Sequence, residues 1–127
     1  MGWQKELEEL RRREALAEQM GGEEKVARQH GRGKMDARAR LAALCDDGTF
    51  REIGKIAGKG SYDEDGNFES VLPAPFLFGK ARINGRPVVA TADDFTIRGG
   101  AADAGISRKM VQAEKMAHEL KLPIIRM

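Results

Sequence analysis

The chain has 127 residues, which fits a single domain, and 41% of them are hydrophobic, enough to build a core. The 22 basic and 20 acidic residues give a net charge of only +2, so overall charge does not indicate a nucleic-acid or membrane partner. A single cysteine, Cys45, excludes an internal disulfide. The lack of a long apolar run and of a signal-peptide pattern favours a soluble, cytoplasmic protein.

The first part of the chain predicts three helices. Strong helix formers over residues 3–20 predict the first helix, which a glycine pair then ends. Acidic residues in a first turn predict a second, short helix over 23–29. Asp36 is suited to cap a third helix, in which Leu41 and Leu44 face inward.

The second part predicts strands joined by turns. Residues 49–53 are expected to form a short strand, and residues 58–70 a polar loop with a turn at Asp65 and Gly66. Two apolar runs, 76–83 and 87–92, flank Asn84 and Gly85, which is a strong signal for a β-hairpin.

A helix and a strand are expected to follow that hairpin. Spacings of four, three, four and three place one apolar face on a helix: Ile106, Met110, Ala113, Ala117 and Leu120. Pro123 ends the helix region, and residues 124–127 begin a strand that returns to the sheet with a right-handed crossover. The sequence therefore predicts an α/β fold, with a helical segment at 1–48 and an α/β segment at 49–127.

A nearly bare loop joins the hairpin to that helix. The segment RGGAADAG carries Gly99, Gly100 and Gly105 among small alanines, where a strand leads into a helix. Glycines there let the backbone approach a ligand, and free amides at a helix start can bind a carbonyl, a purine edge or an anion. The same residues also suit a tight turn without a ligand, and their spacing matches neither the dinucleotide nor the P-loop motif. Both explanations remain open on the residues alone.

Basic residues are concentrated in the segment ARQHGRGKMDARAR. They are Arg28, His30, Arg32, Lys34, Arg38 and Arg40. Convergent cations on a flexible turn next to a helix start are typical of a phosphate site. Two alternatives remain: a basic surface paired with glutamates, and a nucleic-acid-binding arm, although aromatic residues for stacking on single strands are lacking.

Other catalytic arrangements find little support in the sequence. Cys45 is expected to be a buried thiol and His118 a surface imidazole, rather than a nucleophile and its base. One cysteine and two histidines give no metal-ligand spacing, so no metal is expected. Asp93 and Asp94 are adjacent on a predicted strand and point to opposite faces, so they do not form a carboxylate pair.

Three segments occur in a familiar order: RQHGRGKMDARARLAALCDDGTFREIG, then GKARINGRPVVATADDFTIRGGAADAG, then a helix and LPIIRM. From about Val26 to the last residue, the chain resembles the carboxyltransferase (β) subunits of biotin-dependent acyl-CoA carboxylases, of the propionyl-CoA and methylcrotonyl-CoA carboxylase kind. The resemblance implies a crotonase-like ββα superhelix, here partial and preceded by N-terminal helices. Related decarboxylase subunits of sodium-pumping systems share the pattern.

The resemblance also implies a reaction and a site. The family transfers a carboxyl group from carboxybiotin, carried on a separate protein or domain, to the α-carbon of an acyl-CoA. Backbone amides stabilise the enolate oxygen, which agrees with the lack of an acid–base pair in this sequence. By resemblance, Gly99, Gly100 and Ala101 are expected to line the CoA pocket, and Arg32 and Lys34 to bind the CoA phosphates. No residue of this chain is expected to be catalytic.

Members of the family are several times longer and continue into a second glycine-rich loop that supplies the acyl oxyanion hole. The chain is therefore expected to be the N-terminal part of a carboxyltransferase, contributing CoA binding and inactive alone. Biotin carboxylase and the biotin carrier are the expected partners, without nucleic acid or membrane, and exposed strand edges favour a homo-oligomer. Two other functions remain open: a non-catalytic helical assembly module and a basic nucleic-acid-binding module.

Overall fold

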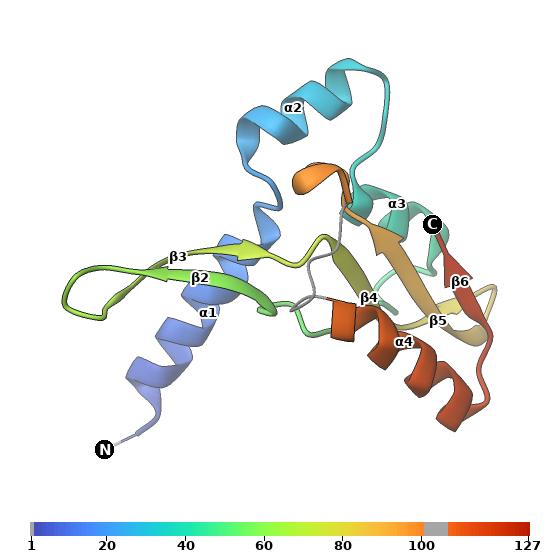
Figure 1. The fold of residues 1–127 in the computed structure, drawn as a ribbon. Coiled ribbons are helices and arrows are strands. Elements are labelled where there is room, and N and C mark those ends of the chain that lie inside the picture. Colours follow the sequence, from blue (N-terminus) through green and yellow to red (C-terminus); the bar gives the residue numbers. More distant parts are fainter. Residues whose placement is uncertain (1, 101–106) are drawn as a thin grey trace.

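The computed structural model describes residues 2–100 and 107–127, a mixed α/β arrangement in which three helices precede the main sheet (Figure 1). The helices are α1 (Gln4–Glu18), α2 (Glu23–Gly31), α3 (Ala37–Leu44) and α4 (Ser107–Leu120), with a short 3₁₀ turn η1 (Arg98–Gly100). The strands are β1 (Arg51–Ile53), β2 (Gly58–Tyr62), β3 (Phe68–Pro73), β4 (Phe76–Ile83), β5 (Arg86–Asp93) and β6 (Ile124–Arg126). The three predicted N-terminal helices are confirmed, although α2 continues beyond its expected end to Gly31.

Four strands form the main sheet in the order β1-β4-β5-β6. β4 and β5 form the predicted hairpin. Asn84 and Gly85 between them have φ angles of 50° and 77°, the left-handed conformation that a two-residue hairpin turn requires. β6 lies beside β5 and parallel to it, after the chain has passed through α4. The predicted return of the chain to the sheet is therefore confirmed.

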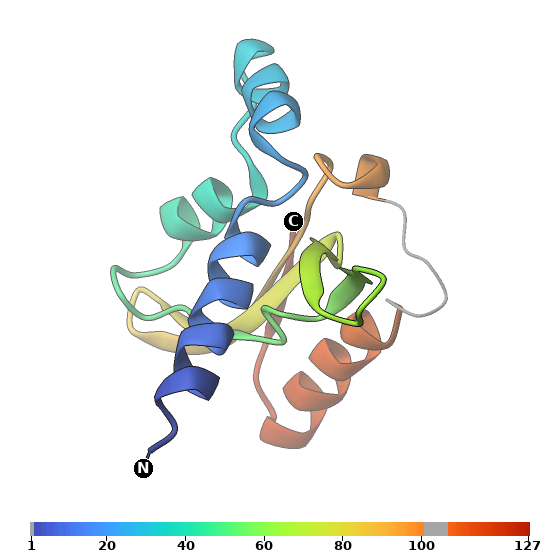
Figure 2. The same cartoon turned by 90° about the vertical axis from the view of Figure 1, so that its left-hand side faces the viewer.

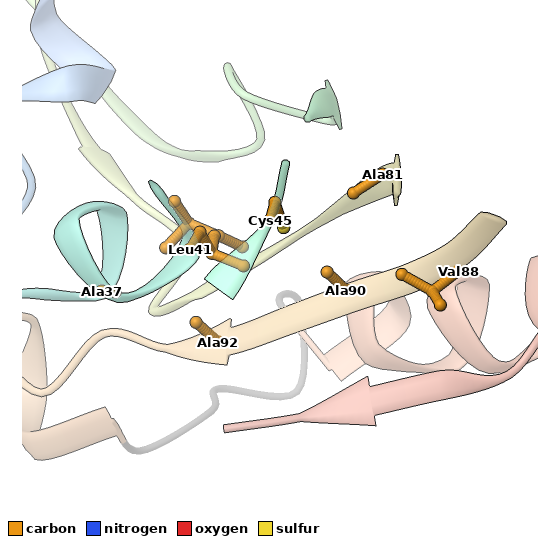
Figure 3. Close-up of a cluster of buried hydrophobic side chains, with 8 residues drawn as sticks. Ala37, Leu41, Cys45, Ala81, Val88, Ala90 and Ala92 are labelled. Carbon is orange, nitrogen blue, oxygen red and sulfur yellow. The ribbon is translucent and has the colours of Figure 1, made fainter. Parts of the chain in front are cut away.

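Alternating side chains of β4 and β5 fill two cores, one on each face of the sheet. The buried residues of the first core are Ala37, Leu41, Cys45, Leu77, Ala81, Val88, Ala90 and Ala92 (Figure 3). Those of the second core are Phe76, Phe78, Val89, Ala113 and Ala117. Because successive strand residues point to opposite faces, α3 covers one face of the sheet and α4 covers the other.

The interpretation of residues 58–70 as a polar loop is wrong, because β2 pairs with β3 in an antiparallel hairpin. Only the turn at Asp65 and Gly66 is confirmed, with Gly66 at a φ of 81°. β2 is exposed throughout and has the sequence GKGSY, so it lacks the alternation of apolar residues that marks a half-buried strand. The hairpin depends instead on backbone pairing and on an edge contact between the rings of Tyr62 and Phe68, whose centroids are 5.8 Å apart.

α1 crosses the β2–β3 hairpin and contacts β3 through arginines rather than through its large apolar side chains (Figure 1). The guanidinium of Arg13 lies over the ring of Phe68, 4.3 Å from the centroid, and Arg12 donates to two backbone carbonyls of β3. The apolar side chains of Trp3 and Leu7, one helical turn apart, are 77% and 43% exposed. Cation–π and hydrogen-bonding contacts therefore hold α1 on the hairpin.

No helix in the described part of the chain is both long and apolar enough to cross a membrane. The division of the chain at residues 48 and 49 stays a prediction, and α3 from the first segment packs into the core of the sheet. Three residues named in the sequence analysis, Ala101, Gly105 and Ile106, lie outside the described residues.

Candidate functional site

A basic hollow of about 580 Å³ lies between α2 and the turn η1 that follows β5, two elements that come together at the same end of the molecule (Figures 1 and 2). Among the described residues its lining includes six basic side chains and no acidic one: Lys25, Arg28, Arg32, Lys34, Arg40 and Arg98. Gln29, Phe95, Thr96 and Gly99 complete the lining. The structure therefore brings together the basic segment and the first residues of the glycine loop, Arg98 and Gly99, which the sequence indicated separately.

The cations of this segment differ in their partners. Arg28 and Arg38 each form an ion pair with a glutamate. Within the described part of the chain, no carboxylate lies within ion-pair distance of Arg32 or Lys34, and both side chains are exposed. A basic surface neutralised by glutamates therefore accounts for Arg28 and Arg38 but not for Arg32 and Lys34.

The glycines of the loop have different local roles. Gly99 and Gly100 both have positive φ angles, of 62° and 78°, which favour glycine. Gly99 lines the hollow, whereas the amide of Gly100 donates to the carbonyl of Ile97 at 2.9 Å and is used inside the turn. A Cβ added at Gly100 would lie in ordinary contact with the ring of Phe95, 3.4 Å away, so glycine is favoured here by the positive φ and not by a lack of space.

Phe95 is an aromatic side chain of the lining that the sequence analysis missed. It is 53% exposed although it is large and apolar. Its place directly after β5, in the DFT triplet, was the available signal. An exposed ring beside cations offers a flat surface on which a nucleotide base can stack.

Thr96 connects this loop to the segment between α1 and α2. Its hydroxyl donates to Asp94 Oδ1 at 2.6 Å and accepts the N–H of Gly21 at 3.0 Å. The Asp94 side chain is buried and also accepts the N–H of Thr96, so this carboxylate orders the loop. Gly21 is required because a Cβ there would overlap the Thr96 carbonyl, and Gly22, with a φ of 97°, turns the chain into α2. These contacts hold α2 opposite η1.

A second connection joins α2 to α3. His30 Nε2 lies 2.8 Å from Asp36 Oδ2, while Asp36 Oδ1 accepts the N–H of Ala39 at 2.8 Å, which confirms the predicted helix cap. Burial by itself raises the pKa of Asp36, but the bonds from Ala39 and His30 outweigh it, and the pKa lies below its usual value. The ionised carboxylate therefore ties together the two helices between which Arg32 and Lys34 lie.

Replacing Asp36 with asparagine is expected to destabilise the chain at neutral pH and to have little effect in acid. Asparagine keeps a capping oxygen but loses the charge that faces His30. Because the pKa of Asp36 is lower in the folded chain, its charge stabilises the fold above the unfolded pKa of about 4, and this contribution is lost as pH falls through the folded value. Urea unfolding of both chains at about pH 6 and about pH 3 measures the difference. A difference that does not change with pH would contradict the prediction.

A cluster of charged side chains centred on Glu52 lies between α1, α3, β1 and α4. Arg38 donates from both terminal nitrogens to the Glu52 carboxylate, at 2.7 and 3.1 Å, and the Glu52 side chain is only 7% exposed. Lys55 Nζ lies 2.8 Å from a Glu18 oxygen and 4.0 Å from Glu52 Oε2. The charge of Glu52 also acts on Lys109 of α4. This cluster was not predicted, since its members come from distant parts of the chain.

Cys45 and His118 do not form a catalytic pair. Cys45 is buried in the core of the sheet, where burial raises the pKa of its thiol, and the nearby Asp46 adds to the increase. His118 is exposed on α4. The predictions of a buried thiol and a surface imidazole are confirmed.

Comparison with known proteins places the fold and the segments in one context. The sequence model of one protein family, the carboxyl transferase domain, matches residues 28–127 of this chain. The propionyl-CoA carboxylase carboxyltransferase subunit of Haloferax mediterranei is 35% identical over 120 residues, which cover 94% of this chain and 23% of the relative. The biotin-dependent long chain acyl-coenzyme A carboxylase beta4 subunit of Mycobacterium tuberculosis is 33% identical over 119 residues, or 94% of this chain and 22% of the relative.

A solved structure agrees with these relatives. The hexameric transcarboxylase 12S, with methylmalonyl-coenzyme A and methylmalonic acid bound, superposes with a TM-score of 0.83 at 31% identity, covering 99% of this chain and 25% of that one. The chain thus spans about a quarter of the length of the proteins it matches. Since the family model extends over most of the chain and the fold agrees, the chain belongs to the carboxyl transferase domain family, as its resemblance implied.

Proposed function

We propose that the basic hollow binds the phosphate groups of an acyl-CoA, and that the chain is the CoA-binding part of a biotin-dependent acyl-CoA carboxyltransferase. The observation that carries the proposal is the convergence of Arg32, Lys34 and Gly99 on one cavity from two distant segments. CoA carries a diphosphate and a 3′-phosphate, and guanidinium and ammonium groups are suited to such anions. The methylmalonyl-CoA bound to the similar transcarboxylase supports this choice of ligand.

The form of the hollow supports the nucleotide end of CoA as its occupant. Its volume of about 580 Å³ lies in the range of small-molecule sites. The exposed ring of Phe95 is available to stack on the adenine, while the cations around it bind the phosphates. Gly99 contributes backbone without a side chain, which lets the ligand lie close to the turn. The roles of Gly100 and Ala101 in the pocket stay predictions.

In the whole protein, carboxybiotin supplies the carboxyl group that is transferred to the α-carbon of the acyl-CoA. Biotin carboxylase and a biotin carrier are the proposed partners of such a subunit, and a homo-oligomer is its proposed assembly. A crotonase-like superhelix is part of the same proposal, supported by the unit of β5, α4 and β6, in which a helix connects two parallel strands. The described residues contribute to substrate binding and have no proposed catalytic role.

Changing Arg32 and Lys34 together to alanine is expected to weaken CoA binding about tenfold or more. Each charge-assisted hydrogen bond contributes roughly 1.5 kcal/mol or more, reduced here because both side chains are exposed. Calorimetric titration with CoA measures the affinity. The matched control changes Lys59 and Lys115 to alanine, which removes the same charge from exposed positions outside the hollow and leaves the affinity unchanged.

Two further ligands sharpen this experiment. Pantetheine, which lacks the nucleotide and phosphates, is expected to bind much more weakly than CoA. Equal affinity of the Arg32 and Lys34 double variant and the unaltered chain for CoA would overturn the assignment of the phosphate site. Binding of a DNA duplex but not of CoA, with a steep dependence on salt, would support the nucleic-acid alternative instead.

A further inference from the structure

A second cavity, of about 490 Å³, lies against α4 and is separate in its lining from the basic hollow. Its walls are mainly apolar and come from distant segments: Ile53, Ala57, Ala74, Phe78 and Met116. Lys109 of α4 also lines it, although this side chain is only 8% exposed. A buried amine at an apolar cavity is unusual, because a charged lysine loses hydration there.

The position of Lys109 follows from the helix. It precedes the buried Ala113 by four residues and Ala117 by eight, so it lies on the face of α4 that packs on the sheet. Its Cε passes close to Gly54, since a Cβ added at that glycine would lie 3.3 Å away. Within the described residues, its ammonium group has no hydrogen-bond acceptor and no ion-pair partner.

The charges around Lys109 leave it partly neutral near physiological pH. Burial lowers the pKa of Lys109 to about 8; the carboxylate of Glu52 opposes this shift, and the guanidinium of Arg38 adds to it. Arg108 and Glu119 also line the cavity and carry opposite charges. An amine reacts as a nucleophile only in its neutral form, which an apolar surrounding favours.

We propose that Lys109 is a site of covalent acylation by small acyl thioesters that enter this cavity. The lone pair of Nζ forms a bond to the thioester carbonyl carbon, the C–S bond breaks, the sulfur leaves with its electron pair, and the proton released by the amine ends on the thiol. The products are an N-acyl-lysine and a free thiol, with no oxidant or other reactant required. The choice of thioesters as the electrophile rests on the proposed function, whereas the reactivity of the amine rests on the cavity.

Incubation of the 127-residue chain with S-propionyl-N-acetylcysteamine, a thioester without a nucleotide, tests the proposal when modified peptides are quantified by mass spectrometry. At about pH 7.5, an amine with a pKa of about 8 has a neutral fraction roughly 200-fold larger than an ordinary lysine. Lys109 is therefore expected to be acylated at least about tenfold faster than Lys115, an exposed lysine on the same helix. The rate at Lys109 is expected to level off above about pH 9, while that at Lys115 continues to rise.

A variant that changes the cavity but not Lys109 tests whether the cavity contributes to the reactivity of the amine. Ala57→Leu narrows the cavity and is expected to slow acylation of Lys109 but not of Lys115. Equal rates at the two lysines in the unaltered chain, or the same pH profile for both, would overturn the proposal. Because the reagent has no phosphate, changing Arg32 and Lys34 to alanine is expected to leave the rate of Lys109 acylation unchanged. A failure of Lys109 to react can therefore be distinguished from a failure of the basic hollow to bind CoA.

Discussion

Replacing Glu52 with glutamine is expected to destabilise the folded chain by about 3 kcal/mol, which is large for a single substitution. Its carboxylate is the buried negative group among three cations: Arg38 at 2.7 Å, Lys55 at 4.0 Å and Lys109. Glutamine leaves these cations near one another without the opposing charge. Arg38 Nε, moreover, is already buried without a hydrogen-bond partner among the described residues. Urea unfolding followed by circular dichroism measures the loss.

Two variants control for this result. Glu114 also pairs with an arginine, Arg126 at 2.9 Å, but both side chains are more than half exposed, so Glu114→Gln is expected to cost less than about 1 kcal/mol. Changing Arg38 and Glu52 together to methionine is expected to cost less than Glu52→Gln alone, since no half-buried guanidinium then lacks its partner. An unfolding midpoint of Glu52→Gln equal to that of the unaltered chain would show that this cluster contributes little to stability.

Features that act over a few residues predicted the elements that the structure confirms. Asn84 and Gly85 determine the β4–β5 turn by their own backbone conformation, and Asp36 caps α3 with its own carboxylate. The β2–β3 hairpin has no such local signal. It depends on pairing between exposed strands and on α1, where Arg13 covers the ring of Phe68. The periodicity of apolar residues in the sequence does not reveal contacts of this kind.

The candidate site was predictable in its parts but not in its assembly. The density of cations indicates Arg32 and Lys34, and a glycine pair indicates the turn η1. Phe95 joins them in the folded chain, where the bond between Gly21 and Thr96 connects its loop to the segment before α2. That bond depends on a backbone amide and a hydroxyl from segments far apart in the chain, which no local pattern encodes.

Lys109 is a different case, since its environment was within reach of the sequence. The apolar face predicted for α4 includes Ala113 and Ala117, and helical spacing places Lys109 on that same face. A charged residue on an apolar stripe is an exception that indicates either an ion pair or an unusual pKa. Which of the two applies depends on the cavity, and the cavity appears only in the folded chain.

Replacing Gly21 with alanine is expected to lower the stability of the chain by about 2 to 3 kcal/mol and to weaken CoA binding. The added Cβ would overlap the carbonyl group of Thr96 and lie 2.9 Å from its hydroxyl oxygen. Backbone atoms cannot move aside as a flexible side chain does, so the α1–α2 connection has to shift and the bond from the Gly21 amide to Thr96 breaks. With α2 displaced, Arg32 and Lys34 no longer face Gly99 across the hollow.

Gly31→Ala, at the end of α2, provides the matched control. No atom lies within 4 Å of a Cβ added at Gly31, and alanine favours helix by up to about 1 kcal/mol, so unchanged or slightly higher stability and unchanged CoA affinity are expected. Thermal unfolding and CoA titration of the two variants distinguish the possible roles of the contact. A Gly21→Ala chain that is less stable but binds CoA normally would show that the contact stabilises the fold without positioning the site. Normal stability together with normal binding would show that α2 is held in place by other contacts, such as the bond between His30 and Asp36.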